Sequence, residues 1–315
     1  MAYDLTKRLV IGLASSALFD LEESDKIFRE QGETKYREFQ REHESVPLNT
    51  GVAFPFIKRL LSLNALSPHD PLVEVILLSR NDPDTGLRVM KSIEYYGLSM
   101  TRAVFLQGSS PLKYIPAFDI ELFLSANNDD VTQAIKEKYP AGKVLKGNIQ
   151  DDPIDTELRI AFDFDGVIID DESECIYQST HNIDDFHMNE TIKKNIIHNP
   201  GPLSKFIKRL ADIQKIEHQC KENDKNYKSI LKTAIVTARN APSHERAINT
   251  LRELGIEINE AFFLGGIEKS KVLEIMKPHI FFDDQELHLE KCSKILPSVH
   301  IPFGITNQNV EKNEF

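Results

Sequence analysis

The segment "IVTARNAPSHERAINTLRELGIEINEAFFLGG", residues 235–266, decides the fold class. It begins with an apolar, β-branched run that is typical of a buried strand. Apolar residues at helical spacing follow, and this stretch closes at Gly255, the residue type that commonly ends a helix. A second apolar run comes next. Strand, helix and strand in this order predict parallel strands joined by a right-handed crossover, and therefore an α/β sheet.

The same pattern occurs a second time in the chain. "LLSRNDPDTGLRVMKSIEYYGLSMTRAVFLQG", residues 77–108, aligns with it without gaps at an offset of 158 positions. The pentapeptide "FIKRL" also occurs twice, at residues 56–60 and 206–210, and "GLASSALFDLEES" from Gly12 aligns with "AFDFDGVIIDDES" from Ala161. Because these matches all keep the same order, we infer a degenerate internal duplication.

The duplication predicts a molecule in two related parts. We expect a doubly wound, Rossmann-like parallel sheet made of a first half, residues 1–138, and a second half, residues 158–304. Proline, glycine and acidic residues make residues 139–157 a predicted linker. Two smaller parts are a cap insert over the second half at about residues 171–200 and a polar C-terminal tail, residues 305–315.

Composition and charge narrow the class of protein. The 315 residues carry a net charge of -11, which argues against general binding to nucleic acids or anionic membranes. Three cysteines lie far apart and fit reduced thiols rather than a disulfide framework. Lys7-Arg8 and the apolar run after it resemble a signal peptide, but acidic residues follow at once without a cleavage site. We therefore expect a first buried strand and a soluble, cytoplasmic protein, and the sequence leaves a homo-oligomer open.

Polar residues stand where the predicted strands of the second half end, and in such sheets ligands bind beyond these carboxyl ends. Each has an ordinary explanation as a solvated loop, a helix cap or a surface charge, so only their joint placement favours a site. The residues are Asp163 and Asp165 in "IAFDFDGVIIDDESE" (160–174), Thr237 with Ala238 beside it, Lys269, and the pair Asp283 and Asp284.

These residue types suit phosphoryl transfer. One carboxylate can attack phosphorus and form an acyl phosphate, and a second, two positions on, can serve as general acid and base. Clustered acids repel one another, so a divalent cation is needed, and oxygen ligands suit Mg²⁺. A hydroxyl and an ammonium can hold the remaining phosphate oxygens. A calcium loop does not fit because the glycine is misplaced, and no glycine-rich dinucleotide motif follows either first strand.

At this point the chain resembles a known superfamily. "DFDGV", the threonine of "IVTARN", Lys269 and "FFDDQ" look like the four motifs of the haloacid dehalogenase superfamily. The resemblance implies that Asp163 is the nucleophile, that Asp165 is the general acid and base, and that Thr237, Ala238 and Lys269 hold the phosphate. Asp163, Asp165, Asp283 and Asp284 would form the Mg²⁺ site, with Asp284 favoured over Asp283 as the direct ligand.

A narrower resemblance covers nearly the whole chain, from about Leu13 to Gly304. "VAFPFIKRLLSLN", "VFLQGSSPLKYI", "LFLSANN" and residues 235–288 resemble the cytosolic 5'-nucleotidase I family. That family implies Mg²⁺-dependent hydrolysis of nucleoside 5'-monophosphates, AMP prominent among them. Vertebrate-type members read FDGDAV where this chain reads "FDFDGV", so both aspartates are kept while base preference is left open. A phosphatase for another small phosphomonoester, or a nucleotide sensor without turnover, are the alternatives.

The first half lacks the carboxylates of the second. The alignment sets Ala14 and Ser16 against Asp163 and Asp165, so the first half is predicted to be catalytically inactive. It either packs only against the active half or keeps a nucleotide effector or anion site at its strand ends. That candidate site comprises Ser15, Ser16, Ser79, Arg80, Asn81 and Ser109. In the cap of the second half, His181, His187 and His198 have no metal-binding spacing and are expected at the surface or at the edge of the substrate.

Overall fold

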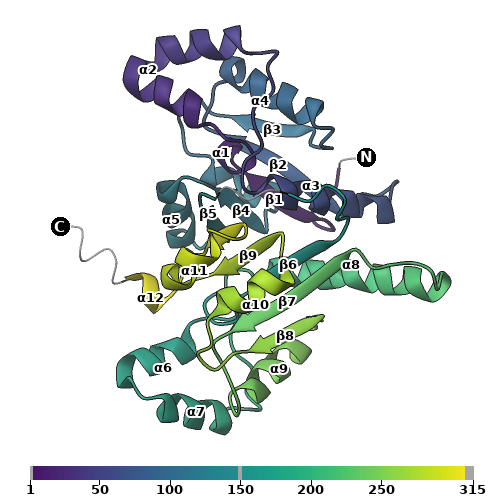
Figure 1. Ribbon diagram of the computed structural model, residues 1–315, viewed down its shortest axis with the longest axis vertical. Coiled ribbons are helices and arrows are strands. Elements are labelled where there is room, and N and C mark those ends of the chain that lie inside the picture. Colours follow the sequence, from purple (N-terminus) through teal and green to yellow (C-terminus); the bar gives the residue numbers. More distant parts are fainter. Residues whose placement is uncertain (1–2, 148–150, 309–315) are drawn as a thin grey trace.

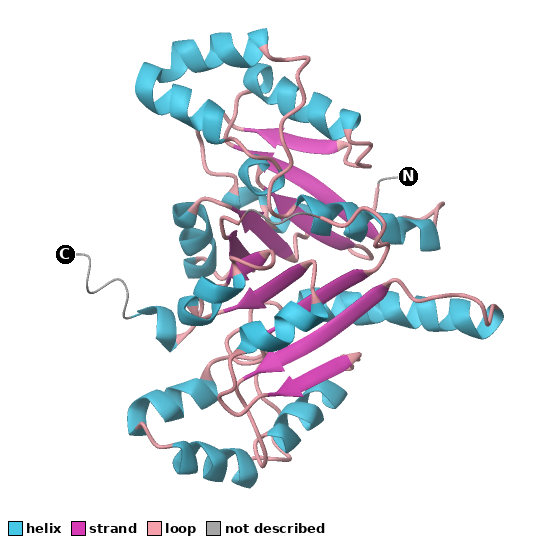
Figure 2. Cartoon of the chain, viewed as in Figure 1, coloured by secondary structure: helices cyan, strands magenta, loops and turns pink. Residues whose placement is uncertain are grey.

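The computed structural model describes residues 3–147 and 151–308, which form a ten-stranded sheet with helices on both faces (Figures 1 and 2). The predicted α/β class with a large, mostly parallel sheet is confirmed. The strands are β1 (Leu9–Leu13), β2 (Val73–Ser79), β3 (Arg102–Phe105), β4 (Leu122–Ser125), β5 (Ala141–Val144), β6 (Leu158–Phe162), β7 (Leu231–Thr237), β8 (Glu260–Phe263), β9 (Ile280–Asp283) and β10 (Ser298–His300).

The sheet has a seam at its centre, where β5 and β10 pair antiparallel; every other neighbouring pair is parallel. Read from its outer strand to the seam, the first half has the order β3-β2-β1-β4-β5 and the second half β8-β7-β6-β9-β10. Register agrees with the sequence alignment as well. Leu13 pairs with Leu77, and Phe162 pairs with Ile235, the residues that the alignment makes equivalent.

The longer helices follow a similar plan in both halves, with the helical inserts at the two ends of the molecule, α2 at the top and α6 and α7 at the bottom of Figure 1. They are α1 (Ser15–Leu18), α2 (Glu22–Glu42), α3 (Phe54–Ser62), α4 (Pro83–Tyr95) and α5 (Asn128–Lys136), then α6 (Glu172–Thr180), α7 (Ile183–Ile192), α8 (Ser204–Asn223), α9 (His244–Glu253), α10 (Lys269–Met276), α11 (Glu286–Cys292) and α12 (Ile305–Gln308). Within residues 3–147 and 151–308, none is both long enough and apolar enough to cross a membrane.

The predicted helix-ending glycines are confirmed in α4 and α9. Gly97 and Gly255 each follow the last turn with φ of 66°, a left-handed conformation that glycine adopts without steric cost. Beyond each glycine the chain turns back in the same way. The Leu98 N–H donates to the Ile93 carbonyl and the Ile256 N–H donates to the Leu251 carbonyl, at 3.1 and 3.0 Å.

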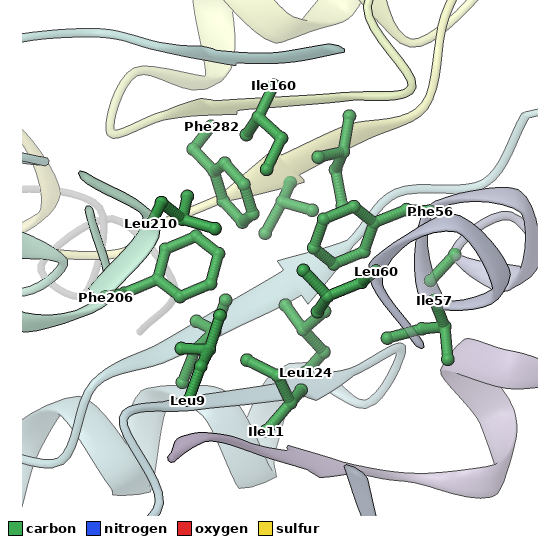
Figure 3. Packing of buried hydrophobic residues seen from close by; sticks show 14 of the residues in the cluster. Leu9, Ile11, Phe56, Ile57, Leu60, Leu124, Ile160, Phe206, Leu210 and Phe282 are labelled. Atoms are coloured by element: carbon green, nitrogen blue, oxygen red, sulfur yellow. The ribbon is translucent and has the colours of Figure 1, made fainter. Parts of the chain in front are cut away.

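One hydrophobic cluster joins the two halves on one face of the sheet (Figure 3). Phe56 from α3 and Phe206 from α8 both pack against Phe282 of β9, with ring centroids 6.4 and 5.9 Å away. The opposite face carries two separate clusters, one for each half. The two halves therefore share part of their core, which opposes their separation into independent domains.

The repeated "FIKRL" helices also tie each half to the other. Arg59 of α3 donates to the carbonyls of Asp152 and Asp155, at 2.8 and 3.0 Å, in the segment that leads into β6. Arg209 of α8 donates to the Thr6 carbonyl before β1 and to the Glu121 carboxylate, the latter at 2.9 Å. Each arginine thus binds backbone carbonyls of the other half, in the segment that precedes the first strand of that half.

The predicted linker, residues 139–157, began too early. Residues 141–144 form β5, one of the two seam strands, and a Cβ on Gly142 would lie 2.4 Å from Val299 Cγ1 of β10. Gly142 therefore allows close packing across the seam rather than marking a flexible turn. Residues 148–150 of that segment lie outside the described residues. The predicted tail begins with α12, and residues 309–315 also lie outside the described residues.

Candidate functional site

Three of the predicted residues meet at the carboxyl ends of β6 and β9. Lys269, the first residue of α10, places its Nζ 2.7 Å from Asp163 Oδ2 and 2.7 Å from Asp283 Oδ2. Asp163 stands directly after β6, and its Oδ1 accepts from the Phe164 N–H at 2.7 Å. All three charged side chains are buried. The strand ends thus bring two of the predicted carboxylates into direct contact with the predicted lysine.

Burial and mutual charge shift the pKa values of these groups in different directions. Burial, only partly opposed by Lys269 and reinforced by Asp283 and Asp165, raises the pKa of Asp163 to about 6. Burial would lower the pKa of Lys269, but the two carboxylates raise it above its usual range. Burial would raise the pKa of Asp283, but Lys269 and His288 lower it. Lys269 therefore stays protonated and Asp283 stays ionised at neutral pH.

Asp284 differs from Asp283 in having a free buried oxygen. Its Oδ2 accepts from Thr306 Oγ1 at 3.0 Å, whereas its Oδ1 has no hydrogen-bond partner among the described residues. Burial, with the charges of Asp283 and Asp163, raises its pKa well above the usual range. A buried carboxylate oxygen without a donor, close to other acids, fits a cation ligand.

Gly166 places Asp284 against the loop that carries Asp163. The glycine has φ of 69°, and a Cβ added to it would lie 2.7 Å from Asp284 Cγ. The "DFDG" loop and the Asp284 carboxylate are therefore in close contact. Asp163, Asp283 and His288 also bring one ligand atom each within 4.8 Å of one another. Both oxygens of Asp283 are already occupied, however, by Lys269, His288 and a backbone N–H, so Asp284 is the better candidate ligand.

Thr237 and Ala238 lie at the end of β7, the neighbour of β6. Thr237 is 1% exposed, and its Oγ1 accepts from the Arg239 N–H at 3.2 Å. Ala238 follows it at an exposed position. This places a hydroxyl at the strand end beside Asp163, where the sequence predicted a phosphate contact.

The remaining predicted residue, Asp165, is held by an arginine that sequence reasoning missed. Arg239 binds both oxygens of Asp165, through Nε at 2.7 Å and Nη2 at 2.6 Å. Its Nη1 binds Glu190 of the cap helix α7. Burial alone would lower the pKa of Arg239, but Asp165 and Glu190 raise it. Arg239 lies only two positions after Thr237 in "IVTARN", which is the signal that could have identified it.

One prediction about the cap histidines was wrong. His198 is 1% exposed, not at the surface. Its Nδ1 lies 3.0 Å from Thr250 Oγ1 and its Nε2 lies 3.2 Å from Arg239 Nη2. The cap insert turns back toward the core at this point, so a polar ring in an irregular segment is buried by tertiary contacts. His181 is exposed in the turn between α6 and α7.

The strand ends of the first half carry serine hydroxyls and one arginine that is already paired with an acid. Ser15 Oγ lies 3.5 Å from Ser79 Oγ, and Ser16 Oγ accepts weakly from a backbone N–H at 3.4 Å. Asn81 accepts from Tyr36 of α2, and Ser109 is exposed. The arginine of this predicted site, Arg80, pairs with Asp130 and donates to the Gly108 carbonyl at 2.9 Å. Its charge is therefore already engaged, which does not favour an anion site.

Comparison of the sequence with known proteins identifies its family. The sequence model of the 5'-nucleotidase family matches residues 1–308. The chain belongs to the 5'-nucleotidase family. A curated member, human cytosolic 5'-nucleotidase 1B, is 36% identical over 295 residues, which cover 91% of this chain and 47% of the relative. The chain thus spans about half the length of that relative. No solved structure gave a significant match to this 5'-nucleotidase family member.

Proposed function

We propose that the second half hydrolyses nucleoside 5'-monophosphates, AMP among the preferred ones, to nucleoside and phosphate. The observation that carries the proposal is the buried group of Asp163, Lys269 and Asp283 at the strand ends, in a chain of the 5'-nucleotidase family. A nucleophilic carboxylate held beside an ammonium, with further acids for a cation, is the equipment of phosphomonoester hydrolysis through a covalent intermediate.

The proposed reaction has two displacements at phosphorus. An Asp163 oxygen forms a bond to phosphorus while the bond to the 5'-oxygen breaks, and Asp165 gives its proton to the departing oxygen. The product is a nucleoside and an acyl phosphate on Asp163. Water then attacks phosphorus and gives a proton to Asp165. The bond between phosphorus and the Asp163 oxygen breaks, which releases phosphate and restores the Asp163 carboxylate. Thr237 and Lys269 would bind the phosphoryl oxygens throughout.

The residues that would hold a divalent cation are Asp163 and Asp284, with Asp165 and Asp283 close behind. The free buried oxygen of Asp284 supports this assignment. Mg²⁺ bound there would neutralise charge on the phosphoryl oxygens and keep the nucleophile ionised. The chain's own contribution is to fix Asp284 against Gly166 and to keep Asp283 on Lys269.

The architecture supports a related proposal on origin. The two halves repeat one strand order and one register on either side of the seam. We propose that they arose by duplication of a unit of the haloacid dehalogenase type, and that only the second half kept the carboxylates. A nucleotide effector site in the first half stays a prediction, which the pairing of Arg80 with Asp130 makes less favourable.

The test is phosphate release from AMP, IMP, CMP, UMP, their deoxy forms and a sugar phosphate, with Mg²⁺ and with EDTA. Asp163→Asn is measured in parallel because it keeps the shape of the nucleophile and removes its charge. The expected result is release from nucleotides that EDTA and the substitution both abolish. Preference for the sugar phosphate would move the substrate, and binding of nucleotides without any release would replace the hydrolase by a sensor.

A further inference from the structure

A buried charged cluster links the cap to the candidate acid and base. Its members, here called the Arg239 cluster, are Asp165, Arg239, Glu190 and His198. Arg239 and Glu190 are 3% and 1% exposed. Placing ionised groups out of water costs free energy that their mutual attraction does not always offset. A cluster of this kind therefore calls for a reason beyond the stability of the fold.

The first half provides an internal control that identifies what the fold itself needs. In the second half Arg246 Nε donates to the Ile196 carbonyl at 2.8 Å, and in the first half the equivalent Arg88 Nε donates to the Val46 carbonyl at 3.0 Å. A second bond is also repeated. The backbone N–H of residue 198 donates to the Thr250 hydroxyl, and that of residue 48 donates to the Ser92 hydroxyl. These bonds hold the insert to the core in both halves and are structural.

The Arg239 cluster, in contrast, occurs in the second half alone. The equivalent positions of the first half hold Ser16 for Asp165, Asn81 for Arg239, Gln40 for Glu190 and Leu48 for His198. Gln40 still accepts from Arg88, at 3.4 Å, much as Glu190 accepts from Arg246, at 2.9 Å. The bonds between the insert and the core are thus kept in the first half, where neutral side chains occupy the positions of the Arg239 cluster. Charged side chains occupy these positions only in the half that has the carboxylates proposed for catalysis.

Geometry explains how the cluster can act. The planar guanidinium of Arg239 binds both oxygens of Asp165, so it fixes the rotation as well as the position of that carboxylate. On its other side Arg239 is fixed by Glu190, and since arginine can only donate, His198 Nε2 accepts from it. Phe164 and Phe186 lie against the guanidinium, at 5.2 and 5.3 Å from ring centroid to Cζ. The arginine is therefore held on all sides.

We propose that Glu190 and Arg239 are positioning residues that couple the cap to proton transfer. Glu190, on cap helix α7, fixes Arg239, and Arg239 fixes the carboxylate of Asp165 at the end of β6. The seating of the cap on the core then sets the orientation of the group that protonates the leaving oxygen. This inference rests on the proposed role of Asp165 as general acid and base.

The experiment compares two leaving groups in Glu190→Gln and Arg239→Lys. Glutamine keeps an oxygen for Arg246 and Ser173 but removes the charge that binds Arg239, and lysine keeps the charge but loses the fork. A nucleoside leaves poorly without a proton, whereas 4-nitrophenolate leaves without one. We expect kcat for AMP to fall on the order of 10²-fold, with KM within about threefold. The first-turnover release of 4-nitrophenolate from 4-nitrophenyl phosphate should stay within about threefold of the wild type.

Gln40→Glu is the matched control, because it makes the reverse exchange at the equivalent place in the first half. It should leave both reactions unchanged. Equal slowing of both leaving groups, no slowing of either, or loss of folding in both variants would overturn the positioning role and leave the cluster structural. A wild type that releases product from neither substrate would instead refute the proposed function, and the two failures are therefore distinguishable.

Discussion

The first and second halves of this protein have one frame and two different sets of side chains at the strand ends. Gly166 in the second half corresponds to Ala17 in the first, and Asp284 corresponds to Ala126. A Cβ at residue 166 would collide with Asp284, whereas the first half has a Cβ there and no acid opposite. The first half forms the short helix α1 here, whereas the equivalent "DFDG" segment of the second half forms turns, in which the Ile168 N–H donates to the Phe164 carbonyl at 3.0 Å. A few coupled exchanges therefore separate a site from a scaffold.

The largest effect should come from Lys269→Met. The ammonium lies between Asp163 and Asp283, and its loss leaves two buried carboxylates without the cation that they share. We expect phosphate release to fall by at least about 10³-fold, and the free energy of unfolding to fall by roughly 3–5 kcal/mol. Activity assays and denaturant unfolding measure the two effects. Lys271→Met on the same helix is the control, and equal losses in both variants would argue against a special role for Lys269.

A smaller effect should come from Gly166→Ala, compared with Gly255→Ala. Both glycines have positive φ, so each substitution should lower the free energy of unfolding by roughly 1 kcal/mol. Nothing lies within 4 Å of a Cβ at residue 255, whereas at residue 166 the Asp284 carboxylate must move. Only Gly166→Ala should therefore lower activity, by about 10- to 100-fold, and raise the Mg²⁺ concentration needed for half-maximal rate. Equal activities would contradict the close contact.

The matched arginines test whether the cap anchorage is the same in both halves. Arg246→Met and Arg88→Met should both lower the midpoint of denaturant unfolding, because each removes a buried bond from the insert to the core. The loss should be larger for Arg246, about 3 kcal/mol, because Glu190 and Glu172 lose a charged partner. For Arg88 the partners are neutral, and about 1–2 kcal/mol is expected. A larger loss for Arg88 would reverse this ranking.

The smallest effect is the pH dependence of stability that comes from Glu121 and His279. These equivalent residues directly precede β4 and β9. Burial lowers the pKa of His279 to about 4, so the folded state resists protonation and stability should fall as pH drops from 6.5 to 4. Burial raises the pKa of Glu121 despite Arg209, so the folded state binds this proton more readily than the unfolded state does. Protonation of Glu121 should therefore raise stability as pH falls, which is the opposite of the effect of His279.

Thermal unfolding against pH measures both signs. His279→Asn keeps an acceptor for the Arg159 N–H and should flatten the acid-side decline by about 2 °C. Glu121→Gln should raise stability at pH 7 more than at pH 4, if Arg209 keeps its bond to Thr6. The comparison of halves fails at this position if both substitutions shift the profile in the same direction.

Much of the fold could be predicted because its signals are local. Apolar runs located the central strands, and Gly97 and Gly255 marked the ends of α4 and α9. The seam could not be predicted, because β5 and β10 have only a few residues each and contain glycine or polar side chains. Their strand structure depends on pairing with β4 and β9 on one side and with each other at the seam, where a Cβ at Gly142 would collide with Val299. Such a pairing joins segments far apart in the chain and leaves no periodic pattern.

The candidate site divides in the same way. Asp163, Asp165, Lys269 and Asp284 were predicted because their chemistry and their place after strands are both visible in the sequence. Glu190 was not, because an acid on a cap helix resembles any solvated charge until the fold buries it on Arg239. Burial and pairing of this kind are tertiary facts, which composition and spacing do not contain.

Because Arg59 and Arg209 each bind the half to which they do not belong, the two halves depend on each other. Each arginine belongs to one half and closes the segment by which the chain enters the other. If the chain were cut between β5 and β6, each fragment would lack the side chain that fastens its own first strand and would expose the shared core. The fragments would recover a native structure only by complementation, as two pieces that must bind each other. The first half, which lacks the carboxylates proposed for catalysis, would thus be needed for the folding of the half that has them.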